Sequence, residues 1–160
     1  MKPLQHLMIS FSLSLAIWLF LKSFAAAIVC FATGIFMDID HLLEYLIHFG
    51  WREFSLENFF RECDTDTIRK GMFRFKKLHL IFHSLELAVI FWLVAIYTKN
   101  IYILALALSY FIHLVFDFVG NFGVVRPYFY FISWRIACNF RTTKMLNRQM
   151  LERNKHLETT

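Results

Sequence analysis

Charged side chains are scarce in this sequence of 160 residues, at 18% of the total, compared with about 25% in an ordinary soluble domain. Hydrophobic residues make up 58%. This balance argues against an ordinary soluble domain and indicates a membrane protein. The length allows one domain, and the sequence contains no internal repeat and no low-complexity segment.

Cysteine is also rare. Cys30, Cys63 and Cys138 are odd in number, lie far apart and form no Cys-x-x-Cys motif. Neither a disulfide framework nor a thiolate zinc site is therefore indicated. Any metal ion is expected to be bound by histidine and carboxylate side chains.

Long apolar runs are the most prominent feature of the sequence. They predict an all-α membrane bundle of about four spanning helices. Most of them are close to the roughly 20 residues that a spanning helix needs. They cover residues 4–21, 24–37, 78–98 and 101–119.

Lys22-Ser23 separates the first two runs, and the pattern predicts a tight helical hairpin there. The second helix is expected to continue to Gly50, a plausible stop. A cleaved signal peptide is the alternative, with Lys2 as its basic start and Ala25–Ala27 as its cleavage site. The sequence after Ala27 stays apolar, which favours uncleaved helices.

The polar segments complete the predicted plan. Residues 51–77 are expected to form a solvent-side loop or a short interfacial helical excursion. Residues 124–140, rich in aromatics and interrupted by Pro127, are expected to lie in the interface without spanning it. We predict one membrane domain over residues 1–140 and a basic helical cytoplasmic tail over residues 141–160.

The formal charge of +5 is concentrated in residues 52–77 and 141–155. Basic segments beside apolar helices indicate the cytoplasmic side of an inner (plasma) membrane. Contacts to anionic lipid are a second interpretation. Five acids lie among the bases of residues 52–77, so nucleic acid is not an expected partner and membrane lipid is.

Metal-ligand residue types gather at the ends of the apolar runs. Charged groups inside a membrane are costly and usually functional, so we interpret this set as the ligands of a metal site. The set consists of His6, Asp38, Asp40, His41, His79, His83, His113 and Asp117. His79 and His83 are four apart, as are His113 and Asp117, which on a helix puts each pair on one face.

Topology predicts that these residues meet. In a four-span arrangement, the chain start, the end of the second helix, the start of the third and the end of the fourth fall on one side of the membrane. Eight ligand groups are too many for one zinc ion and suit two or more ions with a bridging aspartate. Imidazole with carboxylate favours zinc, with manganese or iron as alternatives.

Each motif alone has a simpler interpretation. His113 and Asp117 could form only an intrahelical hydrogen bond, and His6 could be a terminal surface residue. Their joint occurrence is what favours a metal site. Glu44 is expected to be solvated, and Ser84 is expected to cap a helix or orient a ligand.

The order of these motifs resembles the YdjM-like family of inner-membrane metal-dependent hydrolases over residues 1–120. The resemblance rests on the terminal His6, on Asp38-Ile39-Asp40-His41, on His83-Ser84-Leu85 and on His113 with Asp117. The family's middle motif usually reads His-Arg-Gly-x-Thr-His-Ser, and the segment from His79 to Ser84 departs from it. The resemblance implies a metal site. A weaker similarity links the histidine and aspartate pairs to zinc-dependent phospholipase C.

The function expected from these features is metal-assisted hydrolysis of a phosphoester on a lipid or another membrane-proximal substrate. Asp40 or Glu86 would accept the proton, and Arg52, Lys76 and Lys77 would attract the phosphate. The alternatives are a structural ion in a non-enzymatic protein that recruits a partner, and an ion pathway. The polar groups gather near one leaflet, which argues against the pathway.

Overall fold

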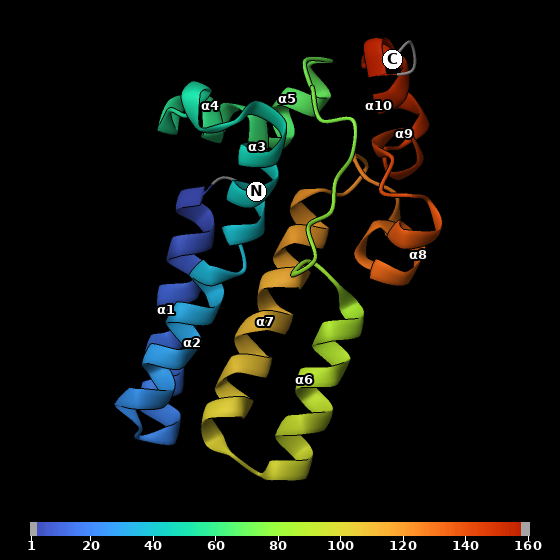
Figure 1. The fold of residues 1–160 in the computed structure, drawn as a ribbon. Helices are drawn as coiled ribbons and strands as arrows, with labels where there is room; N and C mark the ends of the chain where they lie inside the picture. Colours follow the sequence, from blue (N-terminus) through green and yellow to red (C-terminus); the bar gives the residue numbers. More distant parts are fainter. Residues whose placement is uncertain (1–2, 158–160) are drawn as a thin grey trace. The chain divides into compact units, whose positions relative to one another are not determined.

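The computed structural model describes residues 3–157 (Figure 1), and within them it is helical with no β-strand. Lys2 and residues 158–160, which belong to predicted segments, lie outside the described residues. The chain divides into two compact units. The first unit comprises Met1–Ile39 and Phe82–Asp117, and the second comprises Asp40–Ile81 and Phe118–Thr160.

Two helical hairpins build the first unit. Its helices are α1 (Pro3–Leu21), α2 (Phe24–Phe36), α6 (Leu85–Thr98) and most of α7 (Ile101–Gly120). Lys22 and Lys99 each adopt the left-handed conformation, with φ of 52°, at the turn of their hairpin. Figure 1 shows both turns at the same end of the unit. The predicted hairpin at Lys22-Ser23 and the helix over 101–119 are confirmed.

Small residues let the first unit pack closely. On α2, Ala26, Cys30 and Gly34 are buried at a spacing of four residues, which places them on one helical face. A Cβ atom at Gly34 would lie 2.2 Å from Ser10 Oγ, so α1 passes too close for any side chain there. The Ser109 hydroxyl of α7 donates to the Cys30 carbonyl at 2.7 Å. These contacts hold α1, α2 and α7 together.

The outer surface of the first unit is apolar. Large hydrophobic side chains are exposed on all four of its helices, including Phe20, Phe24, Leu93 and Val115. By length and composition, Phe24–Phe49 and Ile101–Gly120 are long and apolar enough to cross a membrane. Gln5–Leu21 and Leu85–Thr98 are shorter apolar helices. Two candidate spans weakly indicate a membrane protein.

Short helices build the second unit. They are α3 (Ile39–Phe49), η1 (Trp51–Glu53), α4 (Leu56–Cys63), α5 (Thr65–Arg69), η2 (Pro127–Tyr130), α8 (Ile132–Ala137), α9 (Thr142–Met145), α10 (Arg148–Arg153) and η3 (Lys155–Leu157). The excursion predicted over 51–77 therefore takes the helical form over its first half. The segment 124–140 contains no helix long enough to span a membrane.

The segment predicted as a tail folds into the second unit. Asn154 is fully buried and donates to the Ile68 carbonyl at 2.8 Å, while its Oδ1 accepts the Phe73 amide at 3.0 Å. Met145 and Leu146 are also buried. Residues 141–157 thus contribute buried side chains to the second unit, and the cytoplasmic location of this segment stays a prediction.

The third predicted span begins later than expected. Residues 78–84 are not helical, and α6 starts only at Leu85. Leu80 has a positive φ of 37°, which a helix does not allow. The Arg135 guanidinium donates hydrogen bonds to the carbonyls of His79 and Leu80, at 2.7 and 2.6 Å. The prediction that His79 and His83 share one helical face is therefore wrong.

Candidate metal centre

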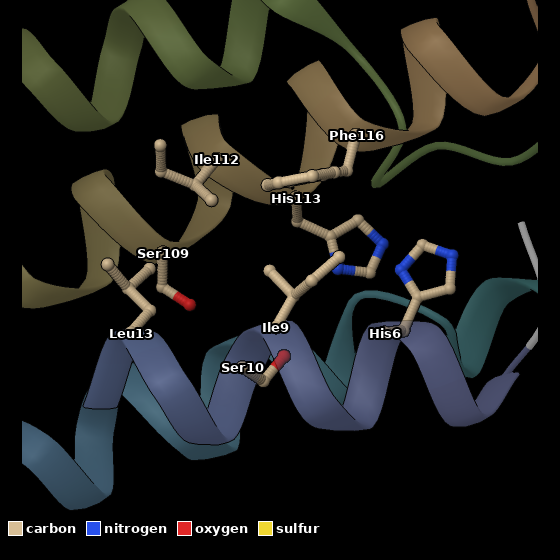
Figure 2. A pocket seen from close by; sticks show the side chains of 8 residues that line it. All are labelled: His6, Ile9, Ser10, Leu13, Ser109, Ile112, His113 and Phe116. Carbon is tan, nitrogen blue, oxygen red and sulfur yellow. The ribbon is translucent and has the colours of Figure 1, made fainter. Parts of the chain in front are cut away.

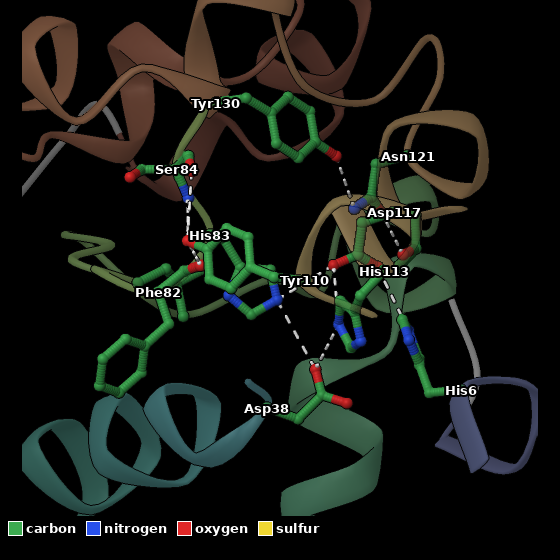
Figure 3. Close-up of polar contacts among 12 residues, drawn as sticks. His6, Asp38, Phe82, His83, Ser84, Tyr110, His113, Asp117, Asn121 and Tyr130 are labelled. Carbon is green, nitrogen blue, oxygen red and sulfur yellow. Dashed lines mark hydrogen bonds and ion pairs between the residues drawn. The ribbon is translucent and has the colours of Figure 1, made fainter. Parts of the chain in front are cut away.

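Five of the eight predicted ligands come together in the first unit (Figure 3). His6 lies on α1, and Asp38 occupies the turn that follows α2. His83 precedes α6, and both His113 and Asp117 lie on α7, one helical turn apart. Each hairpin therefore contributes ligands. We call these five residues the His/Asp cluster.

Four donor atoms of the cluster face one another. His83 Nε2 lies 3.6 Å from Asp38 Oδ1 and 3.0 Å from Asp117 Oδ2. His113 Nε2 lies 3.4 Å from Asp38 Oδ1 and 3.5 Å from Asp117 Oδ2. Two imidazole nitrogens and two carboxylate oxygens thus alternate around a small space.

His6 approaches the cluster from its other side. Its Nε2 lies 3.2 Å from Asp117 Oδ1. Its ring stacks on the His113 ring, with centroids 4.4 Å apart and an interplanar angle of 27°. Asp117 therefore presents one oxygen to His6 and the other to His83 and His113.

The nitrogen-to-oxygen distances of the cluster are close to those found around a metal ion. Zinc bonds to imidazole nitrogen and carboxylate oxygen of about 2.0–2.2 Å give a tetrahedron with edges of about 3.3–3.6 Å. The four distances among His83, His113, Asp38 and Asp117 range from 3.0 to 3.6 Å. The donor atoms of His6, Asp38, His113 and Asp117 also lie within 4.8 Å of one another. The group could hold a metal ion.

Burial of so many polar groups has a large desolvation free energy. His83, His113 and Asp117 have side chains that are only 3–5% exposed, whereas that of Asp38 is 33% exposed. Removing ionised groups from water costs several kcal/mol for each ion unless partners compensate. A bound cation would supply such compensation for the two carboxylates and leave Asp38 at the solvent-accessible edge.

Tyr110 holds the segment that carries His83. Its hydroxyl donates to the Phe82 carbonyl, and it lies 3.2 Å from the Ser84 carbonyl and 3.4 Å from the Ser84 amide. The Ser84 side chain accepts the Leu87 amide at 3.2 Å and so caps α6, as predicted. Sequence reasoning missed Tyr110, although its place three residues before His113 on an apolar helix was a usable signal.

A narrow pocket between α1 and α7 reaches the cluster (Figure 2). His6 and His113 line one end of it, and Ser10 and Ser109 line the other. Apolar side chains of both helices, including Phe116, form its walls. The two stacked histidines therefore border this pocket.

The other predicted ligands belong to the second unit. Asp40 and His41 lie in the first turn of α3, where Asp40 is buried and His41 is partly buried. His79 lies on the extended segment before Phe82. Glu86, a predicted proton acceptor, is in the first turn of α6 in the first unit. Their roles as ligands or proton acceptors stay predictions.

Glu44 is not solvated, contrary to the prediction. It is 3% exposed, and its Oε2 accepts the His79 amide at 2.9 Å. The Nδ1 atom of His79 lies 3.1 Å from both Glu44 oxygens. His48 Nδ1 donates to the Glu44 carbonyl at 3.0 Å. Asp40, Glu44 and His48 recur every four residues on α3, and this spacing was the signal for a shared polar face.

Comparison of the chain with protein-family models, with curated proteins and with solved structures found no match. What is known of the candidate site therefore rests on its own geometry: a buried His/Asp group in an all-helical chain that could bind a metal ion.

Proposed function

We propose that this protein is a membrane-embedded, metal-dependent hydrolase that cleaves a phosphoester of a lipid or another membrane-proximal substrate. The observation that carries the proposal is the carboxylate of Asp117, whose two oxygens face three histidines at 3.0–3.5 Å. A carboxylate shared in this way is typical of a centre with more than one ion, the arrangement that hydrolases of phosphoesters use.

The membrane setting is supported by the surface of the first unit. Exposed apolar side chains cover all four of its helices, and soluble monomers rarely expose patches of this extent. We infer four membrane-crossing helices, of which α2 and α6 are short for a bilayer. The basic residues of 52–77 and 141–155 favour an inner membrane with the site on its cytoplasmic side.

The ions we propose are zinc, with manganese or iron as alternatives, because the cluster offers three imidazoles and two carboxylates. His6, Asp38, His113 and Asp117, whose donor atoms lie within 4.8 Å of one another, would hold the first ion. His83, whose Nε2 lies 3.0 Å from Asp117 Oδ2 and 3.6 Å from Asp38 Oδ1, would begin a second site. That Asp40, His41 and His79 are further metal ligands belongs to the same proposal.

A bound divalent ion would supply a hydroxide near neutral pH and would stabilise charge on the attacked phosphorus group. The chain's own contribution is to fix the ligands. Tyr110 fixes the backbone on both sides of His83, and the helical spacing of His113 and Asp117 aims both side chains at one point. Asp40 or Glu86 would accept the proton.

A structural ion in a non-enzymatic protein that recruits a partner is the second candidate. The observation that favours it is the near-complete burial of His83, His113 and Asp117. A structural zinc site has four protein ligands and no open position, whereas a catalytic site keeps one open. The 33% exposure of the Asp38 side chain favours the catalytic alternative.

The resemblance to the YdjM-like family of inner-membrane metal-dependent hydrolases belongs to this proposal. Of the residues that carry it, His6, Asp38, His83, His113 and Asp117 belong to the His/Asp cluster, whereas Asp40 and His41 of the same motif belong to the second unit. The experiments that follow test the two properties that the resemblance implies, which are metal binding and hydrolysis of a phosphoester.

Metal content is the first test. Elemental mass spectrometry of the detergent-purified protein is expected to find two or more equivalents of zinc, manganese or iron in the wild type. The double variant Asp38→Ala/His113→Ala should lose them, whereas the control His48→Ala/Asp66→Ala, which removes the same residue types from the second unit, should retain them. A folded wild type without stoichiometric metal would overturn the proposal.

Activity is the second test. The metal-loaded wild type should release product from phospholipid or from a model phosphodiester, and the Asp38→Ala/His113→Ala variant should not. A protein that retains its metal but releases nothing from either substrate would favour the structural ion over the hydrolase.

A further inference from the structure

Two segments of the second unit pair in an antiparallel bridge that joins Lys77 to Arg141. The Leu78 amide donates to the Phe140 carbonyl at 2.9 Å, and the Thr142 amide donates to the Lys76 carbonyl at 3.0 Å. This pattern makes Lys77 and Arg141 a non-hydrogen-bonded pair, the kind in which opposite side chains come closest. Two cationic side chains therefore face each other across the bridge.

Like charges directly opposite on paired strands are destabilising. Both Lys77 and Arg141 are exposed, whereas the next residues, Leu78 and Thr142, are buried. The alternation fixes the register, because a slip by one residue would expose Leu78 and bury Lys77. The fold thus holds two positive charges together, which an anion between them would stabilise.

His79, two residues after Lys77, is partly exposed between the buried Leu78 and Leu80. Its side chain is 36% exposed, and Glu44 holds its Nδ1 atom at 3.1 Å. A carboxylate at Nδ1 fixes the ring orientation and leaves Nε2 available for an outside group. The Arg135 side chain fixes the backbone of the same residue through the His79 carbonyl.

The turn before Arg141 is conformationally costly. Asn139 and Phe140 both adopt the left-handed conformation, with φ of 52° and 55°, which is unfavourable for a bulky residue such as Phe140. The Phe140 ring contacts the His79 ring, with centroids 4.7 Å apart. Costly backbone conformations persist where the surrounding structure imposes them, often at binding sites.

Charge is distributed unequally over the second unit. Three of its acids, Asp40, Glu44 and Glu62, are buried, while Glu57 and Glu152 are exposed and Asp64 and Asp66 are partly exposed. Most of its basic residues are exposed. The surface is therefore more positive than the composition suggests. The same unit exposes Trp51 and Phe122, which are 77% and 75% accessible, and exposed aromatics beside basic residues are typical of a membrane interface.

We propose that Lys77, His79 and Arg141 form a binding site for the phosphate of an anionic lipid headgroup. The two cations supply charge, and the oriented imidazole supplies a directed polar contact. The exposed aromatics favour a lipid over a free phosphate or a nucleic acid. The site goes beyond the metal centre, and its binding does not depend on hydrolysis.

Lipid binding to the full-length protein in detergent tests this site. Native mass spectrometry with phosphatidic acid is expected to give a complex that the variant Lys77→Gln/Arg141→Gln weakens about thirtyfold, since each basic residue near an anionic surface contributes about 1 kcal/mol. The control Lys70→Gln/Lys155→Gln removes the same charge from other exposed positions of this unit. It should change affinity by less than about twofold.

Competition with inorganic phosphate separates the two possible sources of the anion. Phosphatidic acid should bind more tightly than inorganic phosphate, and phosphatidylcholine should bind more weakly than phosphatidic acid. Equal weakening by both charge variants, or equal binding of inorganic phosphate and lipid, would overturn the proposal. Loss of metal or of hydrolysis in a protein that still binds phosphatidic acid would affect only the proposed function.

Glu44→Gln tests the positioning of His79. Glutamine keeps the size of the side chain but removes the carboxylate that holds Nδ1. The side-chain ¹⁵N shifts of His79 should show a changed tautomer, and phosphatidic acid affinity should fall while the fold is retained. Unchanged shifts and affinity would remove His79 from the site.

Discussion

Asp117 Oδ1 lies 3.2 Å from His6 Nε2 and so ties the end of α7 to the start of α1. The other oxygen of the same carboxylate faces His83 and His113. This division of one carboxylate between two sides of the cluster is the feature that the first prediction tests.

Asp117→Asn should lower the bound metal by at least one equivalent. The amide keeps one oxygen but replaces the other with an NH₂ group, which cannot coordinate a cation. Elemental mass spectrometry measures the loss, and Asp66→Asn, on α5 of the second unit, is the control. An unchanged metal content would show that Asp117 does not bridge.

Tyr110→Phe should weaken metal binding about 10–100-fold, the usual cost of losing an outer partner of a metal ligand. The substitution removes only the hydroxyl that contacts Phe82 and Ser84. Tyr102→Phe makes the same change at an exposed position of the same helix and should have no such effect. Competition with a chelator of known affinity measures the difference.

Gly34→Ala should destabilise the first unit by about 1–3 kcal/mol, the usual cost of overpacking. The new Cβ would lie 2.2 Å from Ser10 Oγ and 2.8 Å from Ser10 Cβ, so α1 and α2 would have to separate. Thermal unfolding in detergent measures the change. Adding Ser10→Gly removes both contacted atoms, and the double variant should recover part of the lost stability.

Metal removal should lower thermal stability. An ion at 100 times its dissociation constant stabilises the folded state by about 2.7 kcal/mol. Chelation should therefore lower the unfolding temperature of the wild type but not that of the Asp38→Ala/His113→Ala variant. Equal shifts in both proteins would mean that the chelator acts elsewhere.

Cysteine labelling tests the membrane arrangement. Lys22→Cys and Lys99→Cys lie at the two hairpin turns, at one end of the first unit, so an impermeant thiol reagent should reach both from the same side of the membrane. Phe20, on the exposed apolar surface of α1, is the control, and Phe20→Cys should react slowly. Labelling of the two turns from opposite sides would contradict the four-span proposal.

The helices of the first unit were predictable because apolar runs and their polar interruptions are local features. Lys22-Ser23 and Lys99-Asn100 interrupt the runs where the hairpins turn. The late start of α6 was not predictable, because it depends on Arg135, more than fifty residues away from the carbonyls of His79 and Leu80 that it binds. The spacing of apolar residues in the sequence cannot indicate a hydrogen-bond partner so far along the chain.

The candidate site divides in the same way. Topology alone predicted that His6, Asp38, His83, His113 and Asp117 would meet. The burial of Glu44 against His79 was missed, because nothing in the sequence distinguishes a buried acid on α3 from a solvated one. The burial of Met145 and Asn154 in the second unit was missed, because the segment 141–157 is basic and its composition does not indicate buried positions.

The two hairpins share the His/Asp cluster, and this has a consequence for biosynthesis. The first hairpin leaves the ribosome with only His6 and Asp38, and the histidines and aspartate of the second hairpin follow more than forty residues later. In the proposed metal centre the ligands come from both hairpins, so an ion would be captured only after both hairpins have been made. Metal acquisition would then report complete assembly, and a chain truncated before α6 should emerge without metal.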